Sequence, residues 1–114
     1  MDRQKTYDTI KAHAIKQGKK STNGNICLYR DQDGLKCFIG AIIPDELYNP
    51  DMEGNDIYRL ATWKQYDNIR EYLNITAGDD INFLMNVQSI HDTFPVEAWV
   101  KMLEMAAQQY HLVA

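Results

Sequence analysis

The 114-residue chain has few of the features that define membrane-spanning, secreted or disulfide-rich proteins. Its longest apolar run, residues 37–43, includes a glycine and is far shorter than the about 18 residues of a transmembrane helix. The first five residues lack the apolar stretch and cleavage site of a secretion signal, which predicts a cytoplasmic protein with no membrane partner. Only two cysteines are present, so we expect reduced thiols and no disulfide framework.

Internal repeats, low-complexity tracts and linker-like segments are also lacking, which predicts a single domain over residues 1–114. The charge is unevenly distributed along it. Residues 1–36 carry eight Lys/Arg and four Asp, whereas residues 37–114 carry four Lys/Arg and twelve Asp/Glu. An acidic body repels a phosphate backbone, so duplex nucleic acid is disfavoured as a partner and a basic protein surface is favoured. The alternative is that these charges only solvate the surface.

The pattern of the N-terminal half predicts a helix followed by a β-hairpin. Apolar residues recur at helical spacing over residues 6–17, and Gly18 is suited to end that helix. Residues 19–25 are polar and rich in turn formers, which predicts an exposed loop. Residues 26–30 and 35–43 are rich in β-branched and aromatic residues, so we expect two strands joined by a turn at residues 31–34.

The remaining sequence favours helices. A short helix is predicted at residues 44–48, and helical periodicity follows over residues 57–60 and 63–73, then 81–91, then 96–110. The predicted fold class is therefore α+β, with an N-terminal helix, a β-hairpin, and three to four helices packed on the small sheet.

Several motifs in the middle of the chain form a distinctive signature. They are Cys27-x-Tyr29-Arg30, Asp33-Gly34-x-Lys36-Cys37-x-x-Gly40-x-x-Ile43-Pro44-Asp45-Glu46-x-Tyr48 and Met52-Glu53-Gly54. This signature resembles that of small proteins from tailed phages and prophages, and the similarity extends from residue 27 to residue 99. Phe38 departs from the pattern, because a smaller residue is more usual there. The resemblance implies a cellular context, the cytoplasm of a host cell, and an action on host machinery, but no particular activity.

The densest group of acidic and aromatic residues follows the predicted hairpin. A calcium-binding EF-hand is excluded there, because Asp56 stands where the loop needs glycine and Thr62 where it needs glutamate. We interpret the segment as a binding surface for a basic partner, the alternative being a solvated turn whose acids cap helices. The candidate binding residues are Asp45, Glu46, Tyr48, Asp51, Glu53, Asp56 and Tyr58.

No group of residues has the spacing of a known metal or catalytic motif, so neither a cofactor nor a metal is predicted. Cys27 and Cys37 would face each other only in one register of the hairpin, and a two-residue turn would instead pair Cys27 with Gly40. The histidines, at positions 13, 91 and 111, lie in or directly after separate predicted helices. Buried, unreactive thiols are the favoured interpretation.

The leading hypothesis is a non-enzymatic phage-type effector that binds a host protein and modulates or inhibits it, for example in a defence system. One alternative is a small-molecule binder that sequesters a nucleotide-type signal, using Arg30, Lys36 or Arg59 for phosphate and a tyrosine for the base. Another is a metal-assisted enzyme that uses His91 and Asp92, although a histidine near a helix C-terminus more simply complements the helix dipole. Self-association into a homodimer stays open.

Overall fold

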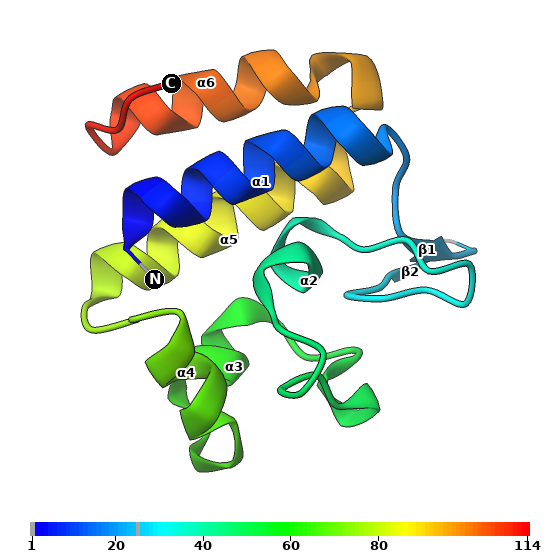
Figure 1. The fold of residues 1–114 in the computed structure, drawn as a ribbon, viewed down its shortest axis with the longest axis vertical. Coiled ribbons are helices and arrows are strands. Elements are labelled where there is room, and N and C mark those ends of the chain that lie inside the picture. Colours follow the sequence, from blue (N-terminus) through cyan, green and yellow to red (C-terminus); the bar gives the residue numbers. More distant parts are fainter. Residues whose placement is uncertain (1, 25) are drawn as a thin grey trace.

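The computed structural model describes residues 2–24 and 26–114. An N-terminal helix precedes a small antiparallel hairpin, and further helices follow, so the predicted α+β class is confirmed (Figure 1). The helices are α1 (Arg3–Gln17), α2 (Phe38–Ile42), α3 (Ile57–Thr62), α4 (Asp67–Tyr72), α5 (Gly78–Thr93) and α6 (Trp99–Gln109), and the strands are β1 (Thr22–Asn23) and β2 (Ile26–Cys27). Short 3-10 turns η1 (Pro50–Met52), η2 (Lys64–Tyr66) and η3 (Val96–Ala98) complete the described elements.

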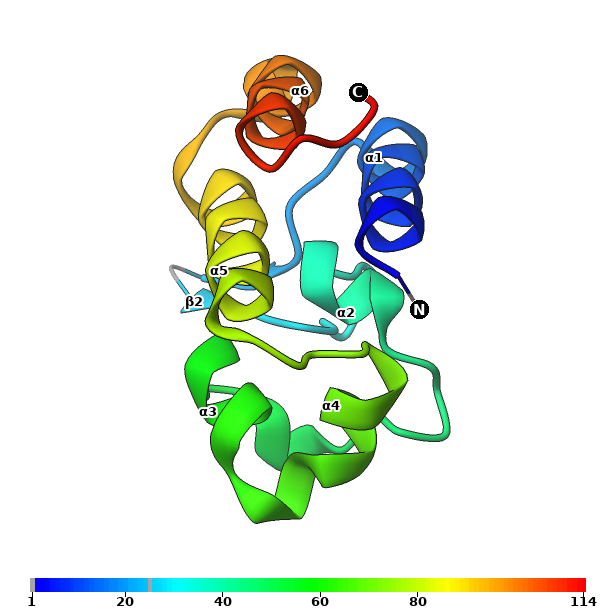
Figure 2. The same ribbon diagram turned by 90° about the vertical axis from the view of Figure 1, so that its left-hand side faces the viewer.

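Helix α1 is confirmed, but it begins one turn earlier than predicted. The Asp2 carboxylate accepts a hydrogen bond from the Lys5 N–H at 2.7 Å and so caps the first turn. The helix ends at Gly18, whose positive φ of 58° glycine adopts without strain. Its buried face packs on α2 and α6, and α5 lies on the side of α2 opposite to α1 (Figure 2).

The predicted hairpin is displaced along the chain. Strand β1 forms inside the segment predicted as a loop, and it pairs with β2 so that Thr22 lies opposite Cys27. The predicted turn at residues 31–34 does form, because Asp31 N–H donates to the Leu35 carbonyl and Gly34 has a φ of 82°. The segments that flank this turn are joined by an isolated bridge between Arg30 and Lys36 and by a hydrogen bond of 3.2 Å from the Cys37 N–H to the Tyr29 carbonyl.

The predicted second strand, residues 35–43, is wrong, since most of it is α2. The Cys37 sulfur accepts a hydrogen bond from the Gly40 N–H at 3.3 Å and caps this helix. Phe38, Ile39 and Ile42 are all buried, so the run is apolar on every side because α1 and α5 surround it. The sequence pattern of a strand covered on both faces is the same as that of a short buried helix.

The C-terminal helices are confirmed in type and corrected in their bounds. The segment 44–48 forms turns where a helix was predicted. The helix predicted over residues 63–73 is divided into η2 and α4 at Tyr66, whose backbone (φ −109°, ψ 20°) leaves the α-helical region. Helix α5 is longer than predicted, and η3 precedes α6. Among the described residues, no helix combines the length and apolar character needed to cross a bilayer.

Candidate binding groove

A groove of about 590 Å³ lies between β2 and α5, and the start of α3 borders it. It draws its residues from parts of the chain that are far apart in sequence. The residues that line it are Ile26, Cys27, Leu28, Tyr29, Cys37, Gly54, Asn55, Asp56, Ile57, Met85, Gln88, Ser89, Asp92 and Thr93.

The apolar part of the groove includes two side chains that remain open to solvent. Ile26 on β2 is 61% exposed, and Met85 on α5 is 44% exposed. Tyr29 and Ile57 also line the groove but are buried among the core residues. The groove therefore extends from the hydrophobic core to the solvent-exposed side chains of Ile26 and Met85.

The charged part of the groove is negative. Asp56 and Asp92 contribute carboxylates, and no lysine or arginine is found among the described residues that line it. Asp56 also caps α3, because its carboxylate accepts the Arg59 N–H at 2.9 Å. One cation comes near, since the Lys20 ammonium lies 3.5 Å from the Asp92 backbone carbonyl oxygen.

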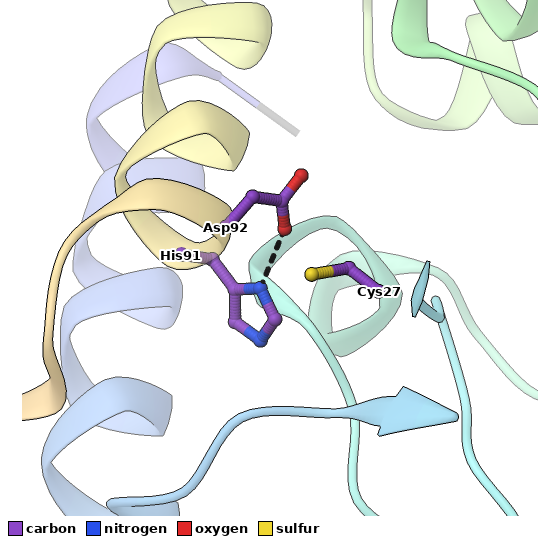
Figure 3. A group of neighbouring side chains, drawn as sticks. All are labelled: Cys27, His91 and Asp92. Atoms are coloured by element: carbon purple, nitrogen blue, oxygen red, sulfur yellow. Dashed lines mark hydrogen bonds and ion pairs between the residues drawn. The ribbon is translucent and has the colours of Figure 1, made fainter. Parts of the chain in front are cut away.

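The end of α5 and strand β2 bring together Cys27, His91 and Asp92 (Figure 3). One sulfur, nitrogen or oxygen atom from each of the three side chains lies within 4.8 Å of the other two. His91 Nδ1 lies 2.8 Å from Asp92 Oδ1, and the Ser21 N–H donates to His91 Nε2 at 3.2 Å. Because Nε2 accepts, the imidazole is neutral and its proton is on Nδ1, which donates to Asp92.

The surroundings of this cluster hold it in place. The His91 ring is buried between Phe38 and Trp99, with ring centroids 5.2 and 5.3 Å away. The Gln88 amide donates to Asp92 Oδ1 at 2.9 Å and accepts the N–H of Ile39 at 3.3 Å. The cluster thus ties the hairpin, α2 and α5 to one another.

The protonation states of the cluster argue against a nucleophilic cysteine. Burial and, to a smaller extent, the neighbouring Asp92 carboxylate together raise the pKa of the Cys27 thiol to about 11. Burial also acts to raise the pKa of Asp92, but hydrogen bonds from His91 and Cys27 outweigh it and the pKa is lowered. The thiol is therefore protonated at neutral pH, and both imidazole nitrogens already have partners. A base that could activate the thiol is not found within this cluster.

The second thiol, Cys37, lies in the wall of the same groove and is buried, as predicted. Burial raises its pKa to about 12. Cys27 is only partly buried, and it pairs with Thr22 across the hairpin, so neither register considered for the two cysteines occurs. Both thiols are free.

Among the candidate binding residues, Glu53 accepts hydrogen bonds from other residues of the chain. Its carboxylate accepts the N–H groups of Tyr29 at 2.8 Å and Arg30 at 3.1 Å, and the Tyr48 hydroxyl at 2.7 Å. The Tyr48 ring also packs against the Arg30 guanidinium, 4.5 Å from the ring centroid. These two candidates are therefore committed to joining the acidic turn to the chain after β2.

The other candidates are distributed over separate places. Asp45 is exposed and pairs with Arg30 at 2.7 Å. Glu46 and Asp51 line a second hollow of about 140 Å³ near η2, and Tyr58 is 57% exposed on α3. Only Asp56 borders the groove.

The phosphate-binding residues proposed for a nucleotide do not meet in the groove. Lys36 lies 3.9 Å from Asp45, which also holds Arg30, and the Arg59 guanidinium stands 5.7 Å from the centroid of the Trp63 ring. None of these three cations lines the groove.

Sequence reasoning missed the α5 face of the groove. Met85, Ser89 and Asp92 recur at i, i+4 and i+7, the spacing that places residues on one side of a helix. The apolar periodicity of residues 81–91 instead predicts Met85 on the buried face. The polar side chains of Ser89 and Asp92, which lie on the same side of the helix as Met85, are the signal that could have placed Met85 at the edge of the buried face.

No family model, curated protein or solved structure matches the chain. The geometry of the groove therefore carries the functional argument.

Proposed function

We propose that this protein is a non-enzymatic binding protein that holds a cationic segment of a partner protein in the groove between β2 and α5. The observation that supports the proposal is the composition of the groove: two carboxylates, two exposed apolar side chains and no lining cation among the described residues. Such a composition favours a ligand that is both positively charged and apolar.

The sign of the charge selects among the possible ligands. Asp56 and Asp92 attract a lysine or arginine side chain and repel phosphate groups, so a nucleotide is the less favoured occupant. An arginine is especially suitable, because its guanidinium bonds a carboxylate with two parallel N–H groups. The exposed Ile26 and Met85 then supply contact area for the apolar residues beside that cation.

The resemblance to phage proteins makes a host protein the expected source of such a segment. Occupation of a host surface would modulate or inhibit that protein without any chemical step, as expected from a cluster that lacks an activated nucleophile. The action on a host defence system remains part of this proposal.

Selection from a random peptide library tests the proposal, because the selection does not depend on which host protein is the partner. We expect the wild-type protein to enrich peptides in which Lys or Arg adjoins apolar residues. Met85→Lys places a competing cation and removes apolar contact in the groove, so it should weaken binding of the enriched peptides at least about tenfold, the effect of 1.4 kcal/mol.

Met105→Lys is the matched control, because Met105 lies on α6, outside the groove, and is 53% exposed. Both substitutions exchange an exposed methionine for lysine on a helix, and both should leave the fold intact by circular dichroism. Equal binding by the two variants, or enrichment of acidic peptides, would contradict the proposal.

A further inference from the structure

We infer that Cys27, His91 and Asp92 form a binding site for a thiophilic divalent cation such as Zn²⁺. The ligand atoms would be Cys27 Sγ, His91 Nδ1 and an Asp92 carboxylate oxygen. This site shares Asp92 with the groove of the proposed peptide binding. It is nevertheless tested separately, because metal binding is read out on the cluster itself and not on the occupant of the groove.

The ligand types fit this class of metal. Thiolate and imidazole together favour Zn²⁺ or a similar transition metal over Mg²⁺ and Ca²⁺, which prefer oxygen ligands alone. Zinc binds sulfur at about 2.3 Å and nitrogen or oxygen at about 2.0–2.2 Å, so three ligand atoms around one ion lie closer together than the 4.8 Å limit seen here. A small inward movement of Cys27, which lies on a strand of only two residues, would complete the arrangement.

The site would keep one position open. Three protein ligands leave the fourth place of a tetrahedral ion to water or to a group on a ligand. Because Cys27 and Asp92 both line the groove, that open position would be reached from the groove. The Gln88 amide, which donates to Asp92, would hold the carboxylate in its orientation.

Metal binding requires two proton movements. The Cys27 thiol releases its proton to solvent and becomes the thiolate ligand. The imidazole proton moves from Nδ1 to Nε2, because Nδ1 must bind the metal through its lone pair. Nε2 can then no longer accept from the Ser21 N–H, so the present hydrogen bond of 3.2 Å must break. Metal binding to His91 and the hydrogen bond from the Ser21 N–H to His91 therefore exclude each other.

Titration of the chelator-treated protein with Co²⁺ tests the inference directly. Cobalt takes the same ligands as zinc, and a cobalt–thiolate bond gives a near-ultraviolet charge-transfer band together with visible bands of a four-coordinate ion. We expect these bands to appear, to vanish when an excess of Zn²⁺ is added, and to be accompanied by faster hydrogen exchange of the Ser21 amide.

Matched variants assign the ligands. Cys27→Ser should abolish the charge-transfer band, whereas Cys37→Ser should retain it, because the Cys37 sulfur caps α2 and serine also caps helices. Asp92→Asn should weaken cobalt binding at least about tenfold while leaving the helical circular dichroism unchanged. Absence of the band in the folded wild-type protein at millimolar Co²⁺, or a band that persists in Cys27→Ser, would overturn the inference.

Discussion

Glu53 illustrates how a single acidic residue can have opposite roles in sequence and in structure. Its position among five nearby acids indicated a charged surface for a partner. In the structure its carboxylate instead accepts hydrogen bonds from the backbone N–H groups of Tyr29 and Arg30, so it satisfies two donors of the fold. Nothing in the sequence distinguishes an acid that serves the fold in this way from an acid that faces solvent.

Glu53→Ala tests this role. Removal of the acceptor leaves the two backbone N–H groups and the Tyr48 hydroxyl without it, and each buried unsatisfied group costs about 1–3 kcal/mol. We therefore expect a loss of about 3 kcal/mol in the free energy of unfolding, measured by urea denaturation. The control is Glu46→Ala, at an exposed position, where we expect a change within about 0.5 kcal/mol. Equal effects at the two positions would contradict this account.

Gly40 is required by a close approach of two backbone segments. A Cβ atom at this position would lie 2.0 Å from the Tyr29 carbonyl oxygen. No side-chain rotation relieves this contact, because the position of a Cβ atom is set by its own backbone and the carbonyl belongs to the backbone of Tyr29. We expect Gly40→Ala to cost about 3 kcal/mol or more, since α2 must move away from Tyr29.

Gly78→Ala is the matched substitution, because it is also in a helix and a Cβ atom there meets no atom within 4 Å. It should change the free energy of unfolding by no more than about 1 kcal/mol, in the stabilising direction. Thermal denaturation of the two variants checks the pair, and a well-folded Gly40→Ala protein with the wild-type melting temperature would refute the close approach.

Among the elements, α1 and α5 are joined at their N-terminal ends by one ion pair. Arg3 lies 2.5 Å from Asp80, which also accepts the N–H groups of Thr76 and Ala77 and so caps α5. Burial acts to raise the pKa of Asp80, but the hydrogen bonds from Arg3 and the two N–H groups outweigh it and the pKa is lowered.

A lowered carboxylate pKa fixes the direction of the pH dependence. The stabilisation by Asp80 is complete above the unfolded pKa of about 4 and is lost as the pH falls through the lower folded value. We expect Asp80→Asn to be less stable than the wild type at neutral pH, and the difference should shrink in acid. Urea denaturation at several pH values measures this, and a difference that grew on acidification would be contrary to the assignment.

The elements also show how far the sequence could determine the fold. Helices α1, α5 and α6 were predictable because each has an apolar stripe at helical spacing or clear end signals, such as Gly18. Helix α2 was not predictable, because the apolar run over residues 35–43, which predicted a strand, fits a buried strand and a buried helix equally. The contacts of α2 with α1 and α5 decide between them, and such tertiary contacts are not visible in local sequence.

The same limit applies to the candidate site. His91, Asp92 and Asp56 were recognised as groups of interest, but as members of separate features. Their proximity to Cys27 and Met85 depends on how the hairpin packs against α5, which the misplaced strands could not reveal. The acidic turn was chosen from residue density, and four of its five acids are exposed, but the Glu53 carboxylate is used inside the fold by the backbone N–H groups of Tyr29 and Arg30.

At the scale of the whole molecule, α6 contacts both α1 and α5, α2 lies between α1 and α5, and the α3–α4 region extends below them (Figures 1 and 2). The hairpin packs at one side of α5, so the groove lies where a two-stranded sheet meets a long helix. The central claim is that this junction, and not the acidic turn, is the surface that contacts a partner.

Chemical-shift mapping tests that claim most directly. An enriched cationic peptide is titrated into the isotope-labelled protein, and the backbone amide signals are followed. We predict that the largest changes fall at residues 26–29 and 85–93, with little change at residues 45–51. Changes that centre on residues 45–51, or on α6 around Met105, would contradict the account.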